Sequence, residues 1–410
     1  MTSKERILAA IDGKEKDHVP LTNWCFGFSA PEHLCWERDG RKVSHWYSKR
    51  MEHIHTLSEP WTLEDDFKRA DTWLSLGIDD ILDVSVPWSQ GVEVSWQDSK
   101  ISAGQVGRYP ILVREYQTPS GRLRHAVQQT GEEPGAGWVI QPDYVPLIED
   151  YNIPRAIEHA VNSVSDIPII KHLYCAPDSE VKLWFAERMN KVKRFANEKG
   201  VLVQAWTAFG MDAVVWLAGA EMAIMMAIDS PEAFRQLVEI IAEADYARTE
   251  LASMDDGVDM VVERGWYSST NFWSPDLFDK YVYPHVAELA ALSHKHGKKF
   301  AYVMTTGLET LGPRLADAGA DVLYFVDPIQ DRILLEKAKE LLGDRITLVG
   351  GTNALSLASH DMERLRIEVK RAIEVLGPTN RFILHPVDSI FPDTPWEGVE
   401  QMIEIWKEYI

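Results

Sequence analysis

Short apolar segments recur along the chain, and each one ends in polar or aromatic residues. Their length and their content of β-branched and aromatic side chains are typical of buried strands. Because the carboxyl ends of parallel strands lie at one edge of a sheet, the residues that follow these segments are expected around a common mouth. The segments predicted as strands are residues 18–24, 79–84, 201–206, 260–265, 299–304, 321–326, 346–350 and 382–385.

Helical segments alternate with the later strands. This alternation predicts a parallel sheet, and the strand count is the one that a (β/α)8 TIM barrel needs. Near the start, Thr2-x-x-Glu5 has the spacing of a capping box, so a short amphipathic helix is expected before the first strand. The predicted helices after residue 201 are 212–226 with 231–254, 275–296, 307–318, 329–342, 362–376 and 396–409.

An antiparallel β insertion is predicted within residues 92–140, between the second and third strands. GVEVSW, YPILVREYQT, GRLRHAVQQT and GWVIQ alternate in polarity as strands do, and Thr118-Pro-Ser-Gly121 is a turn between two of them. Helical segments are expected at 153–164 and 177–199. We interpret residues 1–410 as a single decorated barrel in which the insertion covers the mouth or stabilises it passively.

Charge limits the partners of this chain. The formal net charge of -21 and the pI near 5.1 argue against nucleic acid or an anionic membrane as a partner. The first residues do not resemble a signal peptide, and no apolar run approaches the roughly 20 residues of a membrane span, so we expect a cytoplasmic protein. Cys25, Cys35 and Cys175 lack C-x-x-C spacing and are expected to be reduced thiols.

Aromatic residues are common at the predicted strand ends. A mouth of this kind suits a flat, largely apolar ligand better than a polyacid. Trp216 and Met225 are equally compatible with a helix core, and for Met225 the core is favoured. His53-x-His55 has metal-ligand residue types, but on a helix the two side chains would point apart. The aromatic residues expected at the mouth are Trp24, Phe26, Trp206, Phe209, Trp216, Trp266, Tyr267 and Tyr302.

Three stretches resemble the uroporphyrinogen decarboxylase superfamily, which includes haem-pathway decarboxylases and corrinoid-dependent methyltransferases. They are ERILAAIDGKEKDHVPL, GIDDILDVSVPWSQGVEVSW and FILHPVDSIFPDTPWEGVEQMIE. The most specific pieces are P-D-T-P at 392–395 and D-I-L with its downstream G-x-E-V at 80–82 and 91–94. REYQTPSGRLR at 114–124 resembles an insert of the methyltransferase members. The resemblance implies a (β/α)8 barrel, in agreement with the strand count.

The chain departs from the decarboxylases of this superfamily. They bind the carboxylates of their substrate with an arginine-rich loop after the first strand, where this chain has TNWCFGFSAPEH and no arginine. Asp80 and Ser268 match two functional positions of the family, whereas Trp216 and Asp388 replace its tyrosine and late histidine. Uroporphyrinogen decarboxylation is therefore disfavoured. By the same resemblance, two further polar groups orient neighbours or ligand, namely Asp327 and Asn353.

The chain also departs from the thiol-methylating members. Those enzymes hold zinc with H-x-C after strand five and a cysteine after strand eight. The matching positions here are Tyr302, Met304 and Asp388. A phenol and a thioether are poor zinc ligands, so the usual motif does not support zinc, and no metal ligand is predicted.

The function that remains is corrinoid-dependent methyl transfer. The favoured hypothesis is removal of a methyl group from a methoxylated aromatic or similar donor onto a corrinoid carried by a separate protein. A second hypothesis is transfer from methylcorrinoid to tetrahydrofolate, with Asp80, Asp327 and Asn353 recognising the pterin. A third is a decarboxylase-like or non-catalytic barrel that binds a small ligand. The sequence is compatible with a homodimer.

Methyl-ether cleavage gives the leaving oxygen negative charge, which an acid must meet. Glu263 follows an apolar strand in VVERGWYSS, so burial is expected to raise its pKa and make it a proton donor. An ion pair with a neighbouring arginine is the competing interpretation. Three further catalytic candidates are expected at strand ends, namely Asp388, His385 and Asp80. Strand alternation allows only one of Asp79 and Asp80 to face the barrel interior, and the resemblance selects Asp80.

Overall fold

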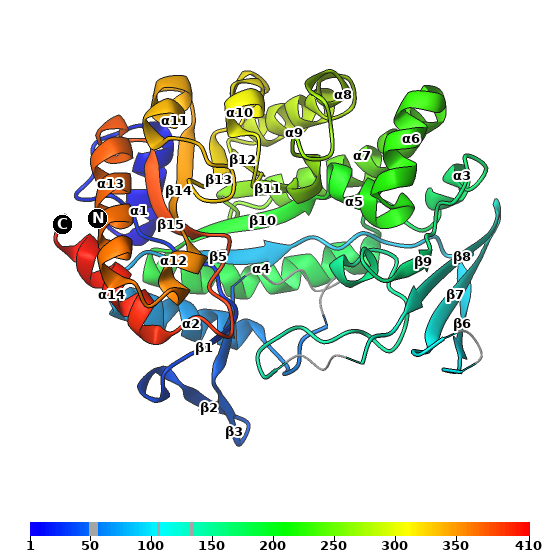
Figure 1. Cartoon of the computed structure of the whole chain (residues 1–410), viewed down its shortest axis with the longest axis horizontal. Coiled ribbons are helices and arrows are strands. Elements are labelled where there is room, and N and C mark those ends of the chain that lie inside the picture. Colours follow the sequence, from blue (N-terminus) through cyan, green and yellow to red (C-terminus); the bar gives the residue numbers. More distant parts are fainter. Residues whose placement is uncertain (49–55, 105–106, 132–134) are drawn as a thin grey trace.

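A seven-stranded parallel sheet organises the computed structural model, which describes residues 1–48, 56–104, 107–131 and 135–410. The strands follow the order β15-β14-β13-β12-β11-β10-β5 and curve into a barrel-like sheet (Figure 1). Seven of the predicted strands are confirmed, with ends that differ by at most three residues. They are β5 (Ile81–Ser85), β10 (Leu202–Ala208), β11 (Met260–Arg264), β12 (Lys299–Val303), β13 (Val322–Val326), β14 (Thr347–Asn353) and β15 (Phe382–Val387).

The remaining predicted strand, at residues 18–24, is wrong as a regular strand. The segment nevertheless lies between β15 and β5, where an eighth strand would close the barrel. Leu21 forms a single parallel bridge to Leu384 of β15, and its carbonyl accepts a hydrogen bond of 2.9 Å from the amide of Asp79, just before β5. A second isolated bridge joins Cys25 to Ile390. Pro20 has no amide hydrogen, so it interrupts the ladder that a regular strand would need. The segment therefore lies between the two edge strands with isolated bridges alone.

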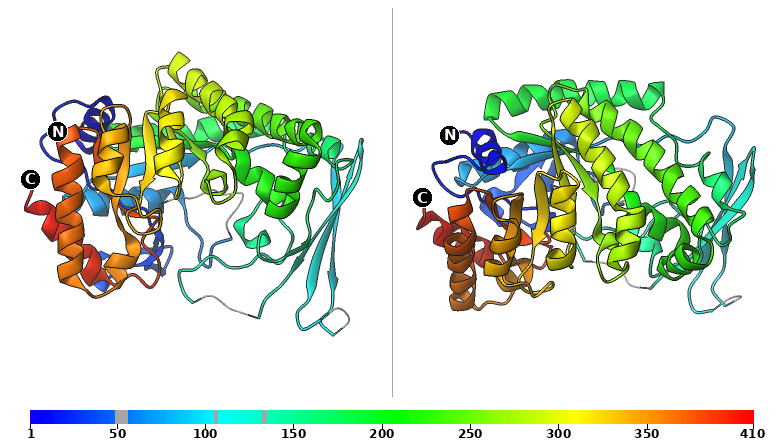
Figure 2. Two further views of the ribbon diagram at one scale, coloured as in Figure 1. Left: turned by 45° about the horizontal axis from the view of Figure 1, so that its top comes forward. Right: turned by 90° about the horizontal axis from the view of Figure 1, so that it is seen from above.

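Helices pack against the outer face of the sheet (Figure 2). The main hydrophobic core fills both the sheet interior and the layer beneath these helices. The helix predicted at 329–342 is confirmed only in its second half, as α11. The helices are α1 (Ser3–Asp12), α2 (Leu63–Ser75), α4 (Ser179–Lys199), α5 (Gly210–Ala218), α6 (Ala220–Asp229), α7 (Pro231–Ser253), α8 (Pro275–Tyr281), α9 (Tyr283–Lys295), α10 (Leu308–Asp317), α11 (Leu335–Leu342), α12 (Ala354–Ala358), α13 (Met362–Leu376) and α14 (Trp396–Lys407).

The helix predicted at 212–226 is two helices, α5 and α6, which meet at an angle of 103°. Gly219 at the break has φ +75°, a backbone conformation that favours glycine. Within the described part of the chain, no single helix is long and apolar enough to cross a membrane, and only this bent pair passes that test jointly.

The predicted antiparallel insertion is a four-stranded sheet, with order β6-β7-β8-β9, at the end of the molecule opposite the two termini (Figure 1). Its strands are β6 (Ser95–Ile101), β7 (Ile111–Thr118), β8 (Gly121–Gln128) and β9 (Ala156–Glu158). The fourth strand was expected in GWVIQ, but Val139 makes only one bridge, to Leu57. The helix predicted at 153–164 is wrong, because this segment supplies β9 and turns. A short helix, α3 (Ile167–Ile170), follows.

Two small two-stranded antiparallel sheets lie between residues 26 and 47. They pair β1 (Phe26–Ser29) with β4 (His45–Tyr47) and β2 (Trp36–Arg38) with β3 (Arg41–Val43). Neither was predicted, because these strands are only three or four residues long. His53 and His55 lie outside the described residues.

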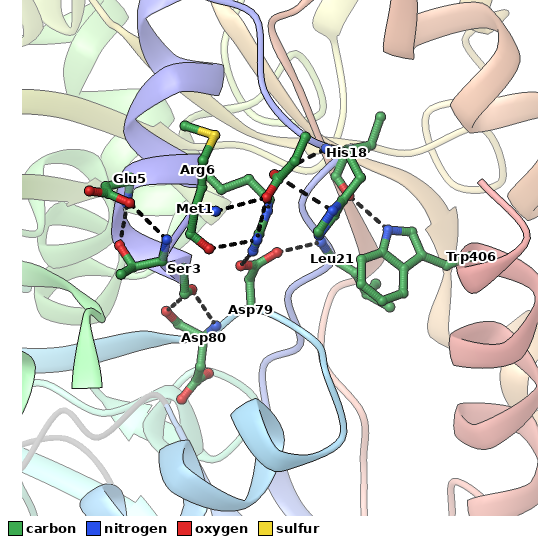
Figure 3. A network of polar contacts seen from close by, with 12 residues as sticks. Met1, Ser3, Glu5, Arg6, His18, Leu21, Asp79, Asp80 and Trp406 are labelled. Carbon is green, nitrogen blue, oxygen red and sulfur yellow. Dashed lines mark hydrogen bonds and ion pairs between the residues drawn. The ribbon is translucent and has the colours of Figure 1, made fainter. Parts of the chain in front are cut away.

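An ion-pair network lies at the amino ends of the strands, opposite the mouth (Figure 3). The predicted capping box of α1 is confirmed, with Thr2 accepting from the amide of Glu5. Arg6 on this helix binds Asp79 at 2.5 Å and also pairs with Asp17. The indole of Trp406 donates to the carbonyl of Val19 at 2.7 Å. These contacts join α1 and α14 to the segments at the amino ends of the strands.

Candidate active site

Two adjoining pockets lie at the carboxyl ends of the parallel strands. Their volumes are about 430 and 310 Å³. Both are lined by Trp266, Thr305, Asp388 and Phe391, so we treat them as one space, the mouth cleft. Trp266 follows β11, Thr305 follows β12 and Asp388 follows β15. The mouth cleft thus lies where (β/α)8 enzymes carry their active sites.

Aromatic rings form the base of the mouth cleft. The ring of Trp24 lies 6.5 Å from that of Trp266, 5.4 Å from that of Trp206 and 4.8 Å from that of Tyr324, on which it stacks. Phe325 packs against Trp24 from the edge at 5.0 Å. Trp24, Trp206 and Trp266, three of the predicted mouth residues, therefore lie together. Trp266 lines the cleft, whereas the other two are buried beneath it.

Arg264, at the end of β11, is the central charged residue of the mouth cleft and was missed by the sequence analysis. Its guanidinium lies between the rings of Trp216 and Trp266, 4.6 Å from each centroid. Nε donates to Asp212 at 2.6 Å, and Nη2 donates to both carboxylate oxygens of Asp150 at 2.8 Å. Two carboxylates and two indoles thus fix one guanidinium in place.

The two carboxylates also hold Tyr267 at the cleft wall. Asp212 accepts from the amide of Tyr267 at 2.7 Å, and Asp150 accepts from its hydroxyl at 3.0 Å. Burial raises the pKa of Asp212 to about 6, although Arg264 opposes this shift. Burial alone would lower the pKa of Arg264, but Asp150 and Asp212 raise it overall. The arginine therefore stays charged and is already paired on two edges.

Glu263 does not face the mouth cleft, which corrects the prediction that it meets the leaving group. Strand alternation turns it away from the side of Arg264, toward the helices outside the sheet. Burial, together with the charges of Asp245 and Asp212, raises its pKa well above the usual range. The competing prediction of an arginine partner is also unsupported, since no ion pair is recorded for it among the described residues. Its carboxyl lines a cavity of about 20 Å³ with Ala242, Tyr246, Tyr281, His285 and Leu289.

Asp80 is also misplaced by the sequence analysis. It precedes β5 at the amino end of the sheet, where both of its carboxylate oxygens accept from Arg69 Nη1 on α2, at 2.9 and 2.8 Å. Both side chains are almost completely buried. The family match selected Asp80 for the barrel interior, but the structure places it in an ion pair with the helical layer. Its distance from the carboxyl ends separates it from the mouth cleft.

Asp83, three residues further along β5, is the carboxylate that faces the barrel interior. It accepts hydrogen bonds from Gln204 Nε2 at 2.6 Å and Trp206 Nε1 at 2.7 Å. Gln204 in turn accepts from the hydroxyl of Tyr324 on β13, a strand that does not neighbour β10, so this contact crosses the interior. Burial raises the pKa of Asp83 to about 7. Asp83 supports the aromatic base through Trp206.

His385 and Asp388 lie at different depths after their shared strand. His385 is fully buried, with Nδ1 3.0 Å from Thr22 Oγ1 and Nε2 3.4 Å from the backbone oxygen of Asp388. Burial lowers its pKa to about 3, so the ring is neutral near pH 7. Its ring stacks on Phe325 at 5.6 Å beneath the cleft. Asp388 is half-buried and lines both parts of the mouth cleft.

Two predicted pairs are hydrogen-bonded to one another. Ser268 binds the hydroxyl of Tyr302 at 2.5 Å, and Tyr302 is fully buried. Asn353 Nδ2 donates to Asp327 at 2.8 Å, and Asp327 also accepts from two amides in the loop after β13. Of these four residues, only Asn353 lines the mouth cleft.

The remaining candidates separate into buried and exposed positions. Trp216 is fully buried in the Arg264 cluster, with Phe209 packed on its edge, and Phe26 lines the smaller part of the mouth cleft. Met225 is 50% exposed, so its predicted core position is wrong. Met304, which the resemblance aligned with a zinc ligand, is buried. In the described ranges, no group of three His, Cys, Asp or Glu residues is arranged to hold a metal ion. Cys25, Cys35 and Cys175 are free thiols.

The sequence analysis also missed residues that the insertion and its flanks bring to the mouth cleft. Asp150 belongs to a 3-10 turn (Asp150–Asn152), and Trp138 precedes it in an irregular segment. The strand pattern could identify neither, because both reach the cleft from loops that are remote in sequence. A polar residue at the end of a strand, as at Arg264, was the one signal available.

A solved structure of similar fold aligns over the whole chain. A methyltransferase from Methanosarcina mazei aligns over 100% of this chain and 99% of that chain, with a TM-score of 0.57 and 18% identity. A B12-independent methionine synthase from Shewanella sp. W3-18-1 aligns over 95% of this chain and 96% of that chain, with a TM-score of 0.43 and 10% identity. A search of curated proteins finds no match.

The family model of uroporphyrinogen decarboxylase (URO-D) matches residues 194–409. This range is more than half of the chain and contains six of the seven parallel strands, from β10 to β15. It also contains Arg264, Trp266, Asn353 and Asp388 of the mouth cleft. The chain therefore belongs to the uroporphyrinogen decarboxylase family.

Proposed function

We propose that this protein is a corrinoid-dependent methyltransferase that removes a methyl group from a small donor, a methoxylated aromatic or similar compound. The observation that carries the proposal is the mouth cleft, an aromatic-lined space at the carboxyl ends of a URO-D-family barrel. Its volume suits a small ring compound. The shared fold with a methyltransferase from Methanosarcina mazei supports this reaction class.

Each residue that lines the mouth cleft has a distinct role in the proposal. Trp266 and Phe391 provide faces against which a flat donor packs. Asn353 and Asp388 orient polar substituents of the donor. Arg264 fixes the position of Trp266 and is the one basic residue among the described residues that line the cleft. Glu263 has no part, because it faces the helical layer.

The corrinoid is a second substrate, carried by a partner protein, and supplies the nucleophile that takes the methyl group. A cleft of this size holds a small donor, whereas the much larger macrocycle has to approach from outside. Leu355, at the lining of the larger part, is 63% exposed and offers apolar surface for such an approach. The residues of this chain thus bind the donor, exclude water around it and present its methyl group outward.

A pterin acceptor is the second candidate function. Asn353 and Gln330 line the larger part of the mouth cleft together with Asp388, and amide and carboxylate groups are what recognition of a pterin edge requires. Asp80 and Asp327, the other residues expected to bind the pterin, do not line the cleft. The candidate therefore depends on fewer groups than the sequence predicted.

The test is methyl transfer under strict anaerobiosis, followed through the absorption spectrum of cob(I)alamin. Purified protein is mixed with a panel of methoxylated aromatics and N-methylated compounds, and methylcobalamin formation is recorded. Conversion with at least one donor supports the proposal. If the reduced corrinoid stays intact with every donor, while methylcobalamin loses its methyl group to tetrahydrofolate, the pterin function replaces it.

A variant pair ties the activity to the mouth cleft. Trp266→Ala removes one aromatic wall and is expected to weaken donor affinity by about tenfold or more, the usual cost of removing a central aromatic contact. The matched control is Trp184→Ala, which removes a half-buried tryptophan from α4 on the outside of the barrel. Equal effects of the two substitutions on affinity would place the donor elsewhere.

A further inference from the structure

The two edges of the insertion sheet differ. β9, at one edge, is three residues long, and its pairing with β8 shifts in register between Ala126 and Val127. β6, at the other edge, is seven residues long and pairs with β7 at every position without a shift. Short or bulged strands commonly protect a sheet edge, and only the β9 edge has these features. In the described part of the chain, no strand or isolated bridge pairs with the other side of β6, which leaves a long, regular edge.

This β6 edge is open to solvent. The insertion sheet lies at the end of the molecule opposite the two termini (Figure 1). The residues from Ser95 to Lys100 are exposed, among them Trp96 with 52% of its surface accessible. β6 contains no proline, so no residue lacks an amide donor. An edge of this kind presents amide and carbonyl groups that a strand from another chain can bind.

The charges of β6 are complementary to those of a second β6 in antiparallel orientation. Asp98 and Lys100 lie on the same face of the strand, because side chains alternate along it. When Ser99 of one copy lies opposite Ser99 of the other, Asp98 of each copy lies opposite Lys100 of the other copy. A two-fold axis through the Ser99 pair therefore makes the same ionic contact twice. On the other face of the sheet the small Ser99 side chains meet, and Gln97 lies opposite Ile101.

The surroundings of Asp98 and Lys100 favour this contact. Nε and Nη2 of Arg114 each donate to one carboxylate oxygen of Asp98 at 2.7 Å. The carboxylate is thus held in place, and its oxygens retain lone pairs for a further donor. Lys100 is exposed, and no ion pair joins it to another described residue. The net charge of -21 makes two copies repel, but salt at about 0.15 M screens charges separated by more than about 8 Å. The local contacts at the edge therefore determine whether the copies associate.

We propose that the β6 edge is a docking surface for a second copy of this chain, which pairs its own β6 antiparallel to the first with the two Ser99 residues opposite each other. The two four-stranded insertion sheets then form one continuous sheet across the dimer. A contact through one strand from each copy is small, so a dissociation constant in the micromolar range is expected. The inference concerns a surface outside the mouth cleft and does not depend on the proposed function.

Sedimentation of the full chain at increasing concentration, at about 0.15 M salt, tests association. The mass is expected to rise from 46.6 kDa toward twice this value. Lys100→Glu places like charges opposite each other at both symmetric contacts and should weaken the dimer at least about tenfold. Lys339→Glu, at an exposed position of α11, is the matched control, because it changes the net charge equally. A monomer at every concentration, or equal effects of the two substitutions, overturns the inference.

A mixture of two charge variants tests the pairing of Asp98 with Lys100. Asp98→Lys and Lys100→Glu each bring like charges together in a dimer of identical copies, so each variant alone should dimerise weakly. A mixed dimer of the two variants has opposite charges at both contacts and should regain most of the affinity. Thermal unfolding of each variant verifies folding, since Asp98→Lys also removes the partner of Arg114. Two folded variants that associate no better when mixed overturn the assigned register.

Disulfide cross-linking locates the two-fold axis. In the proposed register the Cβ atoms at position 99 of the two copies lie about 4.5–5.5 Å apart, so Ser99→Cys should form a cross-linked dimer under mild oxidation. Ser95→Cys is the matched control on the same strand, because its two copies would lie roughly 26 Å apart, eight residues at about 3.3 Å each. The wild type gives the background from Cys35 and Cys175. Cross-linking of Ser99→Cys that does not exceed that of Ser95→Cys overturns the inference.

Discussion

Buried arginine–carboxylate clusters lie at both ends of the barrel, and they differ in what surrounds them. At the amino ends, Arg69 pairs with Asp80, and Arg6 pairs with Asp79 and with the more exposed Asp17. At the carboxyl ends, Arg264 pairs with Asp150 and Asp212 and also lies against the ring of Trp266. The Arg69–Asp80 pair is closed to solvent and joins α2 to the sheet. The Arg264 cluster lies beside an open cleft and holds one of its walls in place.

The largest effect is expected when the buried pair of Arg69 and Asp80 at the amino ends is broken. Arg69→Met leaves Asp80 as an uncompensated buried charge and should lower the free energy of unfolding by about 3–5 kcal/mol. Urea denaturation of the full chain measures it. The double variant Arg69→Met/Asp80→Leu removes both charges and should recover most of the loss.

The control for this comparison is an exposed pair. Arg366→Met breaks the contact with Glu408 on the surface and should change the free energy of unfolding far less than Arg69→Met does, because solvent screens an exposed pair. A cost for Arg69→Met no larger than that of the control would show that the amino-end pair is not structural.

The second effect concerns Glu263, a buried carboxyl outside both clusters. Its native pKa is raised, so between the unfolded value of 4.5 and the native value the folded state keeps a proton that the unfolded state has lost. The stability of the wild type therefore falls as the pH rises through this window, by about 1.4 kcal/mol per unit. Glu263→Gln removes this dependence and should gain stability relative to the wild type with rising pH. Parallel stability profiles of the two proteins would contradict the buried, protonated carboxyl.

The smallest effect is expected from a conservative change of Arg264 in the carboxyl-end cluster. Lysine keeps the charge of Arg264 but cannot stack between two indoles or bind two carboxylates with a planar group. Arg264→Lys should leave the Trp266 wall misplaced and weaken donor affinity by about tenfold, or about 1.4 kcal/mol. Tryptophan fluorescence titration with a methoxylated aromatic measures the change. Unaltered affinity would mean that Arg264 does not organise the mouth cleft.

The sheet was predictable because its strands are buried on both faces and read as apolar runs. The first segment failed because Pro20 and single bridges replace a regular ladder. Residues 153–164 failed because a short edge strand, β9, and turns were mistaken for helical material. The local pattern therefore predicts where a strand lies far better than it predicts which strands it pairs with.

The site was predictable in its aromatic part and not in its charged part. Trp24, Trp206 and Trp266 follow directly from strand ends. The sequence did not show which face of β11 each polar side chain occupies. Glu263 and Arg264 are adjacent, so an error of one residue exchanges the barrel interior with the helical layer. Asp80 was selected by the family resemblance, and Asp83, which faces the barrel interior, was not considered. Asp150 reaches the mouth cleft through tertiary packing, which no local pattern encodes.

The most direct test of the proposed function is a crystal structure of the full chain with a methoxylated aromatic bound. Density for the ligand is expected in the mouth cleft, with its ring against the faces of Trp266 and Phe391. Density in another cavity, such as the surface groove between α11 and α13, with the mouth cleft free of ligand, would contradict it.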